Sequence, residues 1–151
     1  MDLARAIKNA RRTYLCGNGG SAANAIHIAN DLAACGVRAE ALTADVATLT
    51  AIANDRAYEE IFASQIRTKG EKGDVLIVLS GSGKSKNVLQ ALSVGHSLGM
   101  QTWAVVGNYG TGKGPVPHAE HIIRRGANMQ EAEEAQLKIG HEAMRWLKNA
   151  S

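Results

Sequence analysis

The stretch that decides the fold is Gly73-Asp74-Val75-Leu76-Ile77-Val78-Leu79-Ser80-Gly81-Ser82-Gly83-Lys84-Ser85. Its five consecutive apolar residues, 75–79, are typical of a strand that is buried on both faces, as in a parallel sheet. The serines and glycines of 80–85 end this strand, and residues 84–98 have a helical pattern that Gly99 closes. The segment therefore predicts a strand, a loop rich in hydroxyl groups and a helix, in that order.

The same alternation continues on both sides of this segment. Apolar runs predict strands at 13–16, 37–43, 102–106 and 121–124. Helical patterns predict helices at 2–12, 21–34 (capped by Ser21), 47–53, 58–69 and 129–148. Strands that alternate with helices favour a parallel sheet built from βαβ units. We therefore expect an α/β fold, a doubly wound, five-stranded parallel sheet of flavodoxin-like order flanked by helices, in one domain spanning residues 1–151.

Composition excludes several classes of partner. The net charge is only +3, the basic residues occur as scattered pairs, and the chain has one phenylalanine, so we expect no nucleic-acid partner. The apolar runs are too short to span a membrane, and the N-terminus has no hydrophobic signal region. Cys16 and Cys35 are too few for a disulfide framework. These features predict a cytoplasmic protein that binds neither nucleic acid nor membrane.

Two loops at the carboxyl ends of predicted strands are candidate binding elements. Residues 17–21, Gly-Asn-Gly-Gly-Ser, follow the first strand, and residues 80–85 follow the third. In open α/β sheets, ligands bind beyond these ends, at the point where the strand order reverses. The second loop leads into a helix, whose first N–H groups and positive dipole end favour an anion. A phosphate monoester fits this loop, and two such loops on one sheet favour a ligand site over plain connections.

Nucleotide binding is a weaker interpretation of the same glycines. Residues 17–22 fit the G-x-G-x-x-A pattern, but no acidic residue ends the second strand, and Glu40 lies inside it. Residues 107–113 look like a P-loop, but Gly114 stands in place of the required serine or threonine. In the loop 80–85, Val78 occupies the position of the first P-loop glycine. None of the three stretches meets the full requirement.

Histidines and carboxylates on two predicted helices form a third constellation. His27 and Asp31 are four residues apart, so they share a face of one helix. Glu133 and His141 are eight residues apart on the last helix, which separates them by about 80° around its axis. Two imidazoles and two carboxylates suit a divalent ion such as zinc. Spacing alone favours a surface or packing role, since a lone histidine on an amphipathic helix usually has one.

At this point the residues resemble a known family. Residues 17–23 with 27–31, residues 49–55 with 58–62, residues 73–88 and residues 133–141 are similar, in colinear order, to blocks of the phosphoheptose isomerases of the SIS (sugar isomerase) family. The resemblance covers nearly the whole chain. It implies an SIS domain, a homotetramer with sites between subunits, and interconversion of sedoheptulose 7-phosphate with a manno-heptose 7-phosphate.

The resemblance also implies roles for individual residues. Asp31 and His141 would transfer the proton, and zinc would be held by His27, Asp31, Glu133 and His141. Asn54 and Asp55 would reach in from a neighbouring subunit. The other residues expected to bind the phosphorylated sugar are Asn18, Gly19, Gly20, Ser21, Ser80, Gly81, Ser82, Ser85 and Glu133.

The chain departs from the family pattern at several of these positions. Asp31 stands where the family usually has glutamate, and Gly81 where it commonly has threonine. Glu133 stands where the family commonly has glutamine, and Gln130, one turn earlier, is the other candidate for that ligand. Two alternatives therefore accompany the heptose isomerase: an SIS isomerase or sensor for a different phosphosugar, and a non-enzymatic SIS scaffold resembling the DnaA initiator-associating protein.

Overall fold

A five-stranded parallel sheet runs through the protein, in the order β2-β1-β3-β4-β5. The computed structural model describes residues 2–150, and all four strand pairings in it are parallel. The strands are β1 (Thr13–Gly17), β2 (Ala39–Ala41), β3 (Val75–Ser80), β4 (Gln101–Val106) and β5 (His121–Arg124). The predicted fold class and strand number are confirmed. The chain turns from β1 to β2 in one direction and from β3 to β4 in the other, so the order reverses between β1 and β3.

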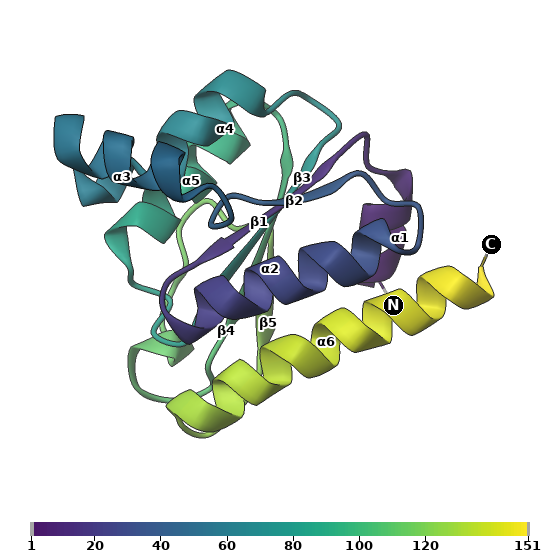
Figure 1. Cartoon of the computed structure of the whole chain (residues 1–151). Helices are drawn as coiled ribbons and strands as arrows, with labels where there is room; N and C mark the ends of the chain where they lie inside the picture. Colours follow the sequence, from purple (N-terminus) through teal and green to yellow (C-terminus); the bar gives the residue numbers. More distant parts are fainter. Residues whose placement is uncertain (1, 151) are drawn as a thin grey trace.

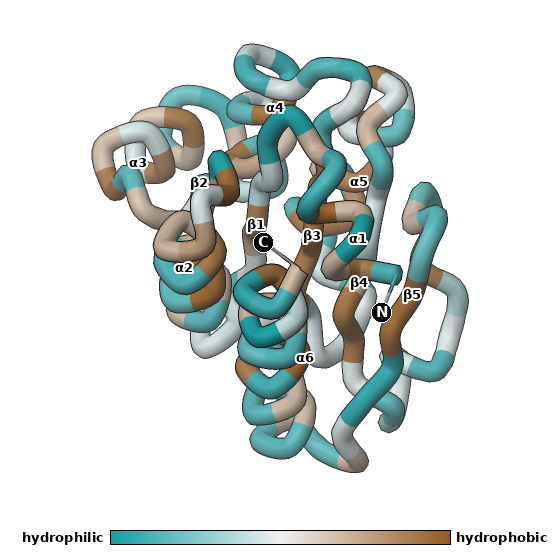
Figure 2. Tube along the Cα trace, turned by 90° about the vertical axis from the view of Figure 1, so that its right-hand side faces the viewer, coloured by the Kyte–Doolittle hydropathy of each residue, from teal (hydrophilic) through white to brown (hydrophobic). Residues whose placement is uncertain are grey.

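Helices cover both faces of the sheet. On one face lie α1 (Asp2–Asn9), α2 (Gly20–Ala33) and α6 (Met129–Asn149), which pack against Leu15, Ile77 and Val105. On the other face lie the 3₁₀ helix η1 (Tyr58–Glu60), α4 (Ala63–Lys69) and α5 (Lys86–Ser97). Side chains alternate between these layers along each strand. The hydrophobic strands run between more polar helices (Figure 2), and α2 and α6 lie side by side (Figure 1).

Several predicted boundaries are corrected by contacts across the fold. The first helix ends at Asn9 rather than at residue 12, because Arg11 N–H donates a hydrogen bond to the carbonyl of Gly73, just before β3. The second strand covers three residues of the predicted 37–43, because Val37 and Thr43 bond α2 instead of β1. The predicted helix 58–69 is divided into η1 and α4, where the buried Ile61 and Phe62 turn into the core.

The start of α2 also differs from the prediction. Gly19 occupies the N-cap position with φ of 57°, a conformation that favours glycine, and the helix begins at Gly20. Ser21 is therefore not the cap. Its hydroxyl is buried and accepts a hydrogen bond from Gln136 of α6.

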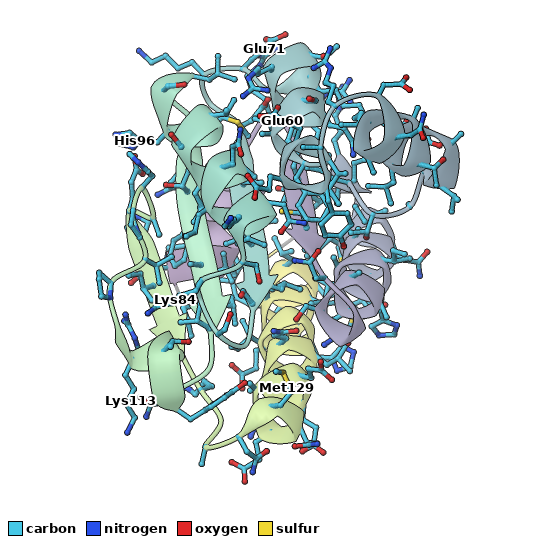
Figure 3. The ribbon with its side chains drawn as sticks, turned by 90° about the vertical axis from the view of Figure 1, so that its left-hand side faces the viewer. Glu60, Glu71, Lys84, His96, Lys113 and Met129 are labelled. Atoms are coloured by element: carbon cyan, nitrogen blue, oxygen red, sulfur yellow. The ribbon has the colours of Figure 1, made fainter. Side chains whose placement is uncertain are left out.

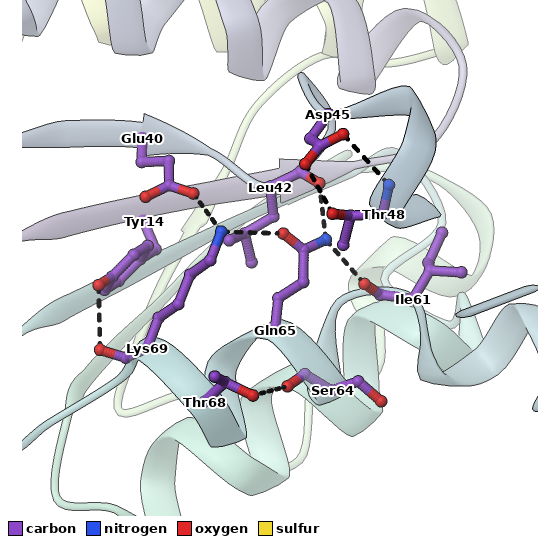
Figure 4. Close-up of polar contacts among 10 residues, drawn as sticks. All are labelled: Tyr14, Glu40, Leu42, Asp45, Thr48, Ile61, Ser64, Gln65, Thr68 and Lys69. Carbon is purple, nitrogen blue, oxygen red and sulfur yellow. Dashed lines mark hydrogen bonds and ion pairs between the residues drawn. The ribbon is translucent and has the colours of Figure 1, made fainter. Parts of the chain in front are cut away.

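Helix α3 (Val46–Asp55) lies at the edge of the fold, at the left of Figure 1, where Leu49, Ile52 and Ala53 pack partly buried against the core. Asp45 caps it by accepting from Thr48 N–H at 3.1 Å, and Gln65 of α4 donates to the carbonyls of Leu42 and Ile61 (Figure 4). These bonds fix the path into the helix, yet none of its own residues is buried. The helix therefore presents Asn54 and Asp55 to solvent.

The sheet positions the candidate site by bringing loop ends together. The loops after β1 and β3 and the start of α6 lie at the end of the molecule opposite the two chain termini (Figure 1). Within residues 2–150, no helix has both the length and the apolar character needed to cross a membrane.

Candidate active site

The loop after β3 is shaped by its own serines. Ser80 Oγ accepts a hydrogen bond from Gly83 N–H at 3.1 Å, and Ser82 Oγ accepts from Lys84 N–H at 3.2 Å. Each hydroxyl uses a lone pair in these bonds, so its proton remains available to a ligand. Ser85 occupies the N-cap of α5 without making a side-chain capping bond. The loop can therefore offer hydroxyl and helix N–H donors to one anion.

An amide pair holds the loop after β1 against the segment that follows β3. Asn18 and Asn87 exchange two hydrogen bonds of 2.9 Å, and Tyr58 Oη donates a third to Asn18 Oδ1 at 3.0 Å. Asn87 is buried at the start of α5. These bonds tie the sugar-loop candidate (residues 17–21) to the start of α5, which directly follows the phosphate-loop candidate (residues 80–85).

Close packing requires glycine at two positions in the loop after β1. A Cβ on Gly17 would lie 2.7 Å from the carbonyl oxygen of Leu79. A Cβ on Gly20 would overlap the carboxylate of Glu133, which therefore lies directly over this loop. The predicted sugar-binding residues Gly19, Gly20 and Glu133 are thus brought to one place.

Asn54 and Asp55 are not brought to this place within the chain. Both are exposed at the end of α3, where the Asn54 amide donates to the Asp55 carboxylate at 2.9 Å. Among residues 2–150, neither makes a hydrogen bond or ion pair with the two loops. A cavity of about 210 Å³ beside the loop 17–21 is lined instead by Leu49, Thr50 and Ala53 of α3.

Three of the four predicted metal ligands converge. His27 Nε2 and His141 Nε2 lie 3.1 Å apart, and each lies 3.3 Å from Asp31 Oδ2. His27 and Asp31 come from neighbouring turns of α2, and His141 comes from α6, which packs beside it. This His–Asp–His cluster is partly exposed, with Asp31 the most covered of the three side chains.

The cluster fits a metal ion such as zinc. Three ligands at about 2.0–2.1 Å on a tetrahedral ion stand about 3.3–3.4 Å from one another, close to the separations of these atoms. Two imidazole nitrogens facing each other and a carboxylate oxygen also form a donor set that a cation would satisfy. Glu133 is not part of the cluster. Its carboxylate lies over Gly20 in this structure.

A buried polar network lies between the cluster and the loops. Gln136 of α6 is 1% exposed, donates to Ser21 Oγ at 3.0 Å and accepts from the Asn24 amide at 2.9 Å. Asn24 also donates to the carbonyl of Glu133 at 3.0 Å. The network locks α2 and α6 in register, and with them the histidines that each helix carries.

The sequence interpretation missed the roles of two residues in this region: Asn87 and Gln136. A usable signal existed for Gln136, because Ala132, Gly140, Ala143 and Leu147 are buried at helical spacing and Gln136 lies in the same stripe. A polar side chain at a core position of an amphipathic helix indicates a buried hydrogen-bond network. For Asn87 no comparable signal exists, because its role depends on pairing with Asn18 of another segment.

Fold and site together define a class of protein: a doubly wound α/β protein with its two candidate ligand loops at the switch point of the sheet. The model of the SIS domain family matches residues 2–107. The chain belongs to the SIS domain family.

The chain is similar to proteins named phosphoheptose isomerase. It is 44% identical over 116 residues to that of Thiobacillus denitrificans (73% of this chain, 59% of the relative) and 43% identical over 127 residues to that of Helicobacter pylori strain P12 (80% and 66%). It thus spans less than two thirds of these curated relatives. The solved phosphoheptose isomerase of Francisella tularensis superposes with a TM-score of 0.86 at 31% identity, covering 97% of this chain and 83% of that one.

Proposed function

We propose that the chain is an aldose–ketose isomerase that acts on a sugar phosphate. The preferred substrate is sedoheptulose 7-phosphate, converted to D-glycero-manno-heptose 7-phosphate. The observation that carries this proposal is the convergence of His27, Asp31 and His141 on the two helices that lead away from the ligand loops. Similarity to proteins named phosphoheptose isomerase supports the choice of substrate.

The residue types suit the reaction. Exchange between an aldose and a ketose removes a proton next to a carbonyl and returns it one carbon away, through an enediolate. The step needs a base, an acid for the oxygen and stabilisation of the developing negative charge. Asp31 would move the proton between the two carbons, and His141, 3.3 Å away, would exchange a proton with the sugar oxygen.

The phosphate group would be held away from the reacting carbons. Ser80, Ser82, Ser85 and the backbone at Gly81 would bind it at the start of α5, and Asn18, Gly19, Gly20, Ser21 and Glu133 would bind the sugar. His27 lies seven residues from Gly20, which is about 10 Å along α2. Remote phosphate binding then positions C1 and C2 beside Asp31 and His141 without taking part in the chemistry.

Zinc is the cofactor that we propose for the His–Asp–His cluster. His27, Asp31 and His141 would hold it, with Glu133 or Gln130 as a weaker fourth partner. The ion would supply positive charge for the oxygen on which negative charge develops. Because its ligands must be deprotonated, zinc affinity should fall as the pH is lowered. Elemental analysis of protein purified without chelator, followed by stripping and zinc return, tests the assignment.

The subunit arrangement is a further part of the proposal. We propose a homotetramer in which Asn54 and Asp55 reach the loops of a neighbouring subunit. The exposure of α3 supports it, since Val46 is 68% exposed and nearby Tyr58 61% exposed. Cys16 and Cys35 are both free thiols, which accords with a cytoplasmic location.

One experiment tests the reaction directly. Purified protein is incubated with sedoheptulose 7-phosphate in deuterated water and followed by NMR. We expect an aldose to form with solvent deuterium at C2. Other ketose phosphates form the comparison set. Faster turnover of another sugar phosphate would favour the alternative of an SIS isomerase for a different phosphosugar. No turnover of any sugar by zinc-loaded protein would favour the non-enzymatic SIS scaffold.

A further inference from the structure

Gly81, the second residue of the phosphate-loop candidate (residues 80–85), is required to be glycine for a steric reason. Its backbone does not lie in the left-handed region, so a side chain would be allowed there by conformation. Space forbids it. A Cβ on Gly81 would lie 2.7 Å from Tyr109 Oη and 3.0 Å from Met129 Sδ. The place of a residue 81 side chain is thus already filled by a hydroxyl from another segment.

Tyr109 is held there by a loop that is built onto the phosphate loop. Residues 107–114 follow β4, and Gly107 N–H bonds the carbonyl of Gly81 at 3.1 Å. Thr111 Oγ1 donates to the carbonyl of Ser82 at 2.9 Å. The ring of Tyr109 lies against Gly107, where a Cβ would come within 2.7 Å of Tyr109 Cδ1. The position of the phenol is therefore fixed relative to the loop that would bind phosphate.

The far side of this loop is fastened by an arginine. Arg124 of β5 donates to the carbonyl of Gly112 at 3.0 Å and to that of Gly114 at 2.6 Å. A Cβ on Gly112 would lie 2.8 Å from the carbonyl oxygen of Gly81, so the two loops are in direct backbone contact. The arrangement leaves Tyr109 little freedom to move away.

Within the described part of the chain, residues 2–150, the Tyr109 hydroxyl makes only a weak hydrogen bond. Its hydrogen-bond acceptor is the Met129 thioether, at 3.5 Å, and a thioether is a weak acceptor. Met129 opens α6 and lies in the lower half of Figure 3, toward Lys113 and opposite Glu71. A phosphate oxygen is a far better acceptor, and hydrogen bonds to charged groups are the strong ones.

We propose that Tyr109 is a phosphate-binding residue, whose hydroxyl donates to the substrate phosphate. The hydroxyl occupies the space that a side chain at position 81 would fill. This inference rests on the proposed function, in which residues 80–85 hold the phosphate. It assigns the specificity for a phosphorylated sugar partly to the loop after β4. Gly81 and Tyr109 then form a matched pair, because the glycine leaves room for the phenol.

The first test removes only the hydroxyl. Tyr109→Phe keeps the ring on Gly107, so the loop retains its packing. We expect KM for the sugar phosphate, and the inhibition constant of inorganic phosphate, to rise about tenfold or more, the usual worth of a hydrogen bond to a charged group. The kcat should stay within about twofold. Tyr14→Phe is the matched control, because Tyr14 Oη bonds the carbonyl of Lys69 at the other end of the sheet.

The second test places a hydroxyl on residue 81 itself and removes that of Tyr109. Gly81→Ser alone should weaken phosphate binding, because its Cβ meets Tyr109, and Tyr109→Ala alone should weaken it by loss of the donor. The double variant Gly81→Ser, Tyr109→Ala should recover most of the lost affinity. Thermal melts of all variants verify folding, and additive losses in the double variant would refute the matched pair.

The outcomes also separate this inference from the proposed function. Ser82→Ala serves as the reference for the phosphate loop, since Ser82 is part of it. If Ser82→Ala raises KM and Tyr109→Phe does not, Tyr109 is a packing residue and the inference is wrong. If neither variant changes the affinity for inorganic phosphate or substrate, the assignment of phosphate to residues 80–85 is itself wrong.

Discussion

Asp31 has two roles in the proposed site, metal binding and proton transfer. Its Oδ2 lies 3.3 Å from the Nε2 atoms of both His27 and His141, so the same carboxylate would bind a metal ion and move a proton. Aspartate is one methylene shorter than the glutamate usual in the resembling family. A shorter side chain can reach the ion but has less freedom to reach the sugar carbon as well.

Substitution of Asp31 should therefore act mainly on the chemical step. We expect Asp31→Asn to lower kcat by about 10²-fold or more, the usual contribution of a general base, with a smaller change in KM. Asp31→Glu should keep or raise kcat. Steady-state kinetics with zinc present checks both, and an unchanged kcat in the asparagine variant would contradict the assignment.

Gln136 connects the core to the site without touching the proposed substrate. It is almost fully buried and satisfies both Ser21 and Asn24. Gln136→Met keeps the length of the side chain but removes the donor to Ser21 Oγ and one of the two acceptors of the Asn24 amide. We expect a loss of about 1–3 kcal/mol in the free energy of unfolding, measured by urea denaturation. Gln130→Met, at an exposed position of the same helix, is the control and should change stability little.

At the scale of elements, the contact between α2 and α6 decides whether the His–Asp–His cluster forms. Gly140 is buried at this contact, next to His141 in sequence. A Cβ at this position would lie 2.6 Å from Ile28 Cγ1 and 3.0 Å from Ile28 Cδ1. The helices approach closely because glycine leaves room for isoleucine.

Gly140→Ala sets two effects against each other. Alanine favours the helix by about 1 kcal/mol, while overpacking a core contact costs about 1–3 kcal/mol. We expect a net loss of stability and weaker zinc binding, because α6 must move away from α2. Adding Ile28→Val should recover part of both. Calorimetry and zinc titration of the single and double variants check this, and a more stable single variant with unchanged zinc affinity would contradict it.

Elements were predictable where one local pattern dominated. The apolar run 75–79 and the glycine and serine residues after it specify β3 and its loop, as observed. The short β2 and the division of 58–69 could not be predicted, because the bonds of Val37 and Thr43 to α2 and the burial of Phe62 in the core decide them. Helical spacing places His27 beside Asp31, but only the packing of α6 on α2 brings His141 to them.

At the scale of the whole molecule, the proposed site needs a second subunit. Mixing two inactive variants tests this: Asp55→Ala removes the neighbour's contribution, and Asp31→Asn removes the base. If the site lies between subunits, random mixed oligomers contain about one intact site in four, and activity returns on mixing. Refolded Asp31→Asn alone is the control. A monomer by light scattering, or no recovery after mixing, would place the complete site within one chain.

The two covered faces of the sheet carry different parts of the proposed chemistry. Phosphate binding depends on α5, which packs on one face of the sheet. Proton transfer depends on α2 and α6, which pack on the other face. Mutations that adapt one half to a new substrate need not disturb the hydrophobic packing of the other. The fold is in this sense modular. Selection or directed evolution could exchange the sugar recognised while retaining the reaction, or retain the ligand and abandon catalysis, as a sensor would.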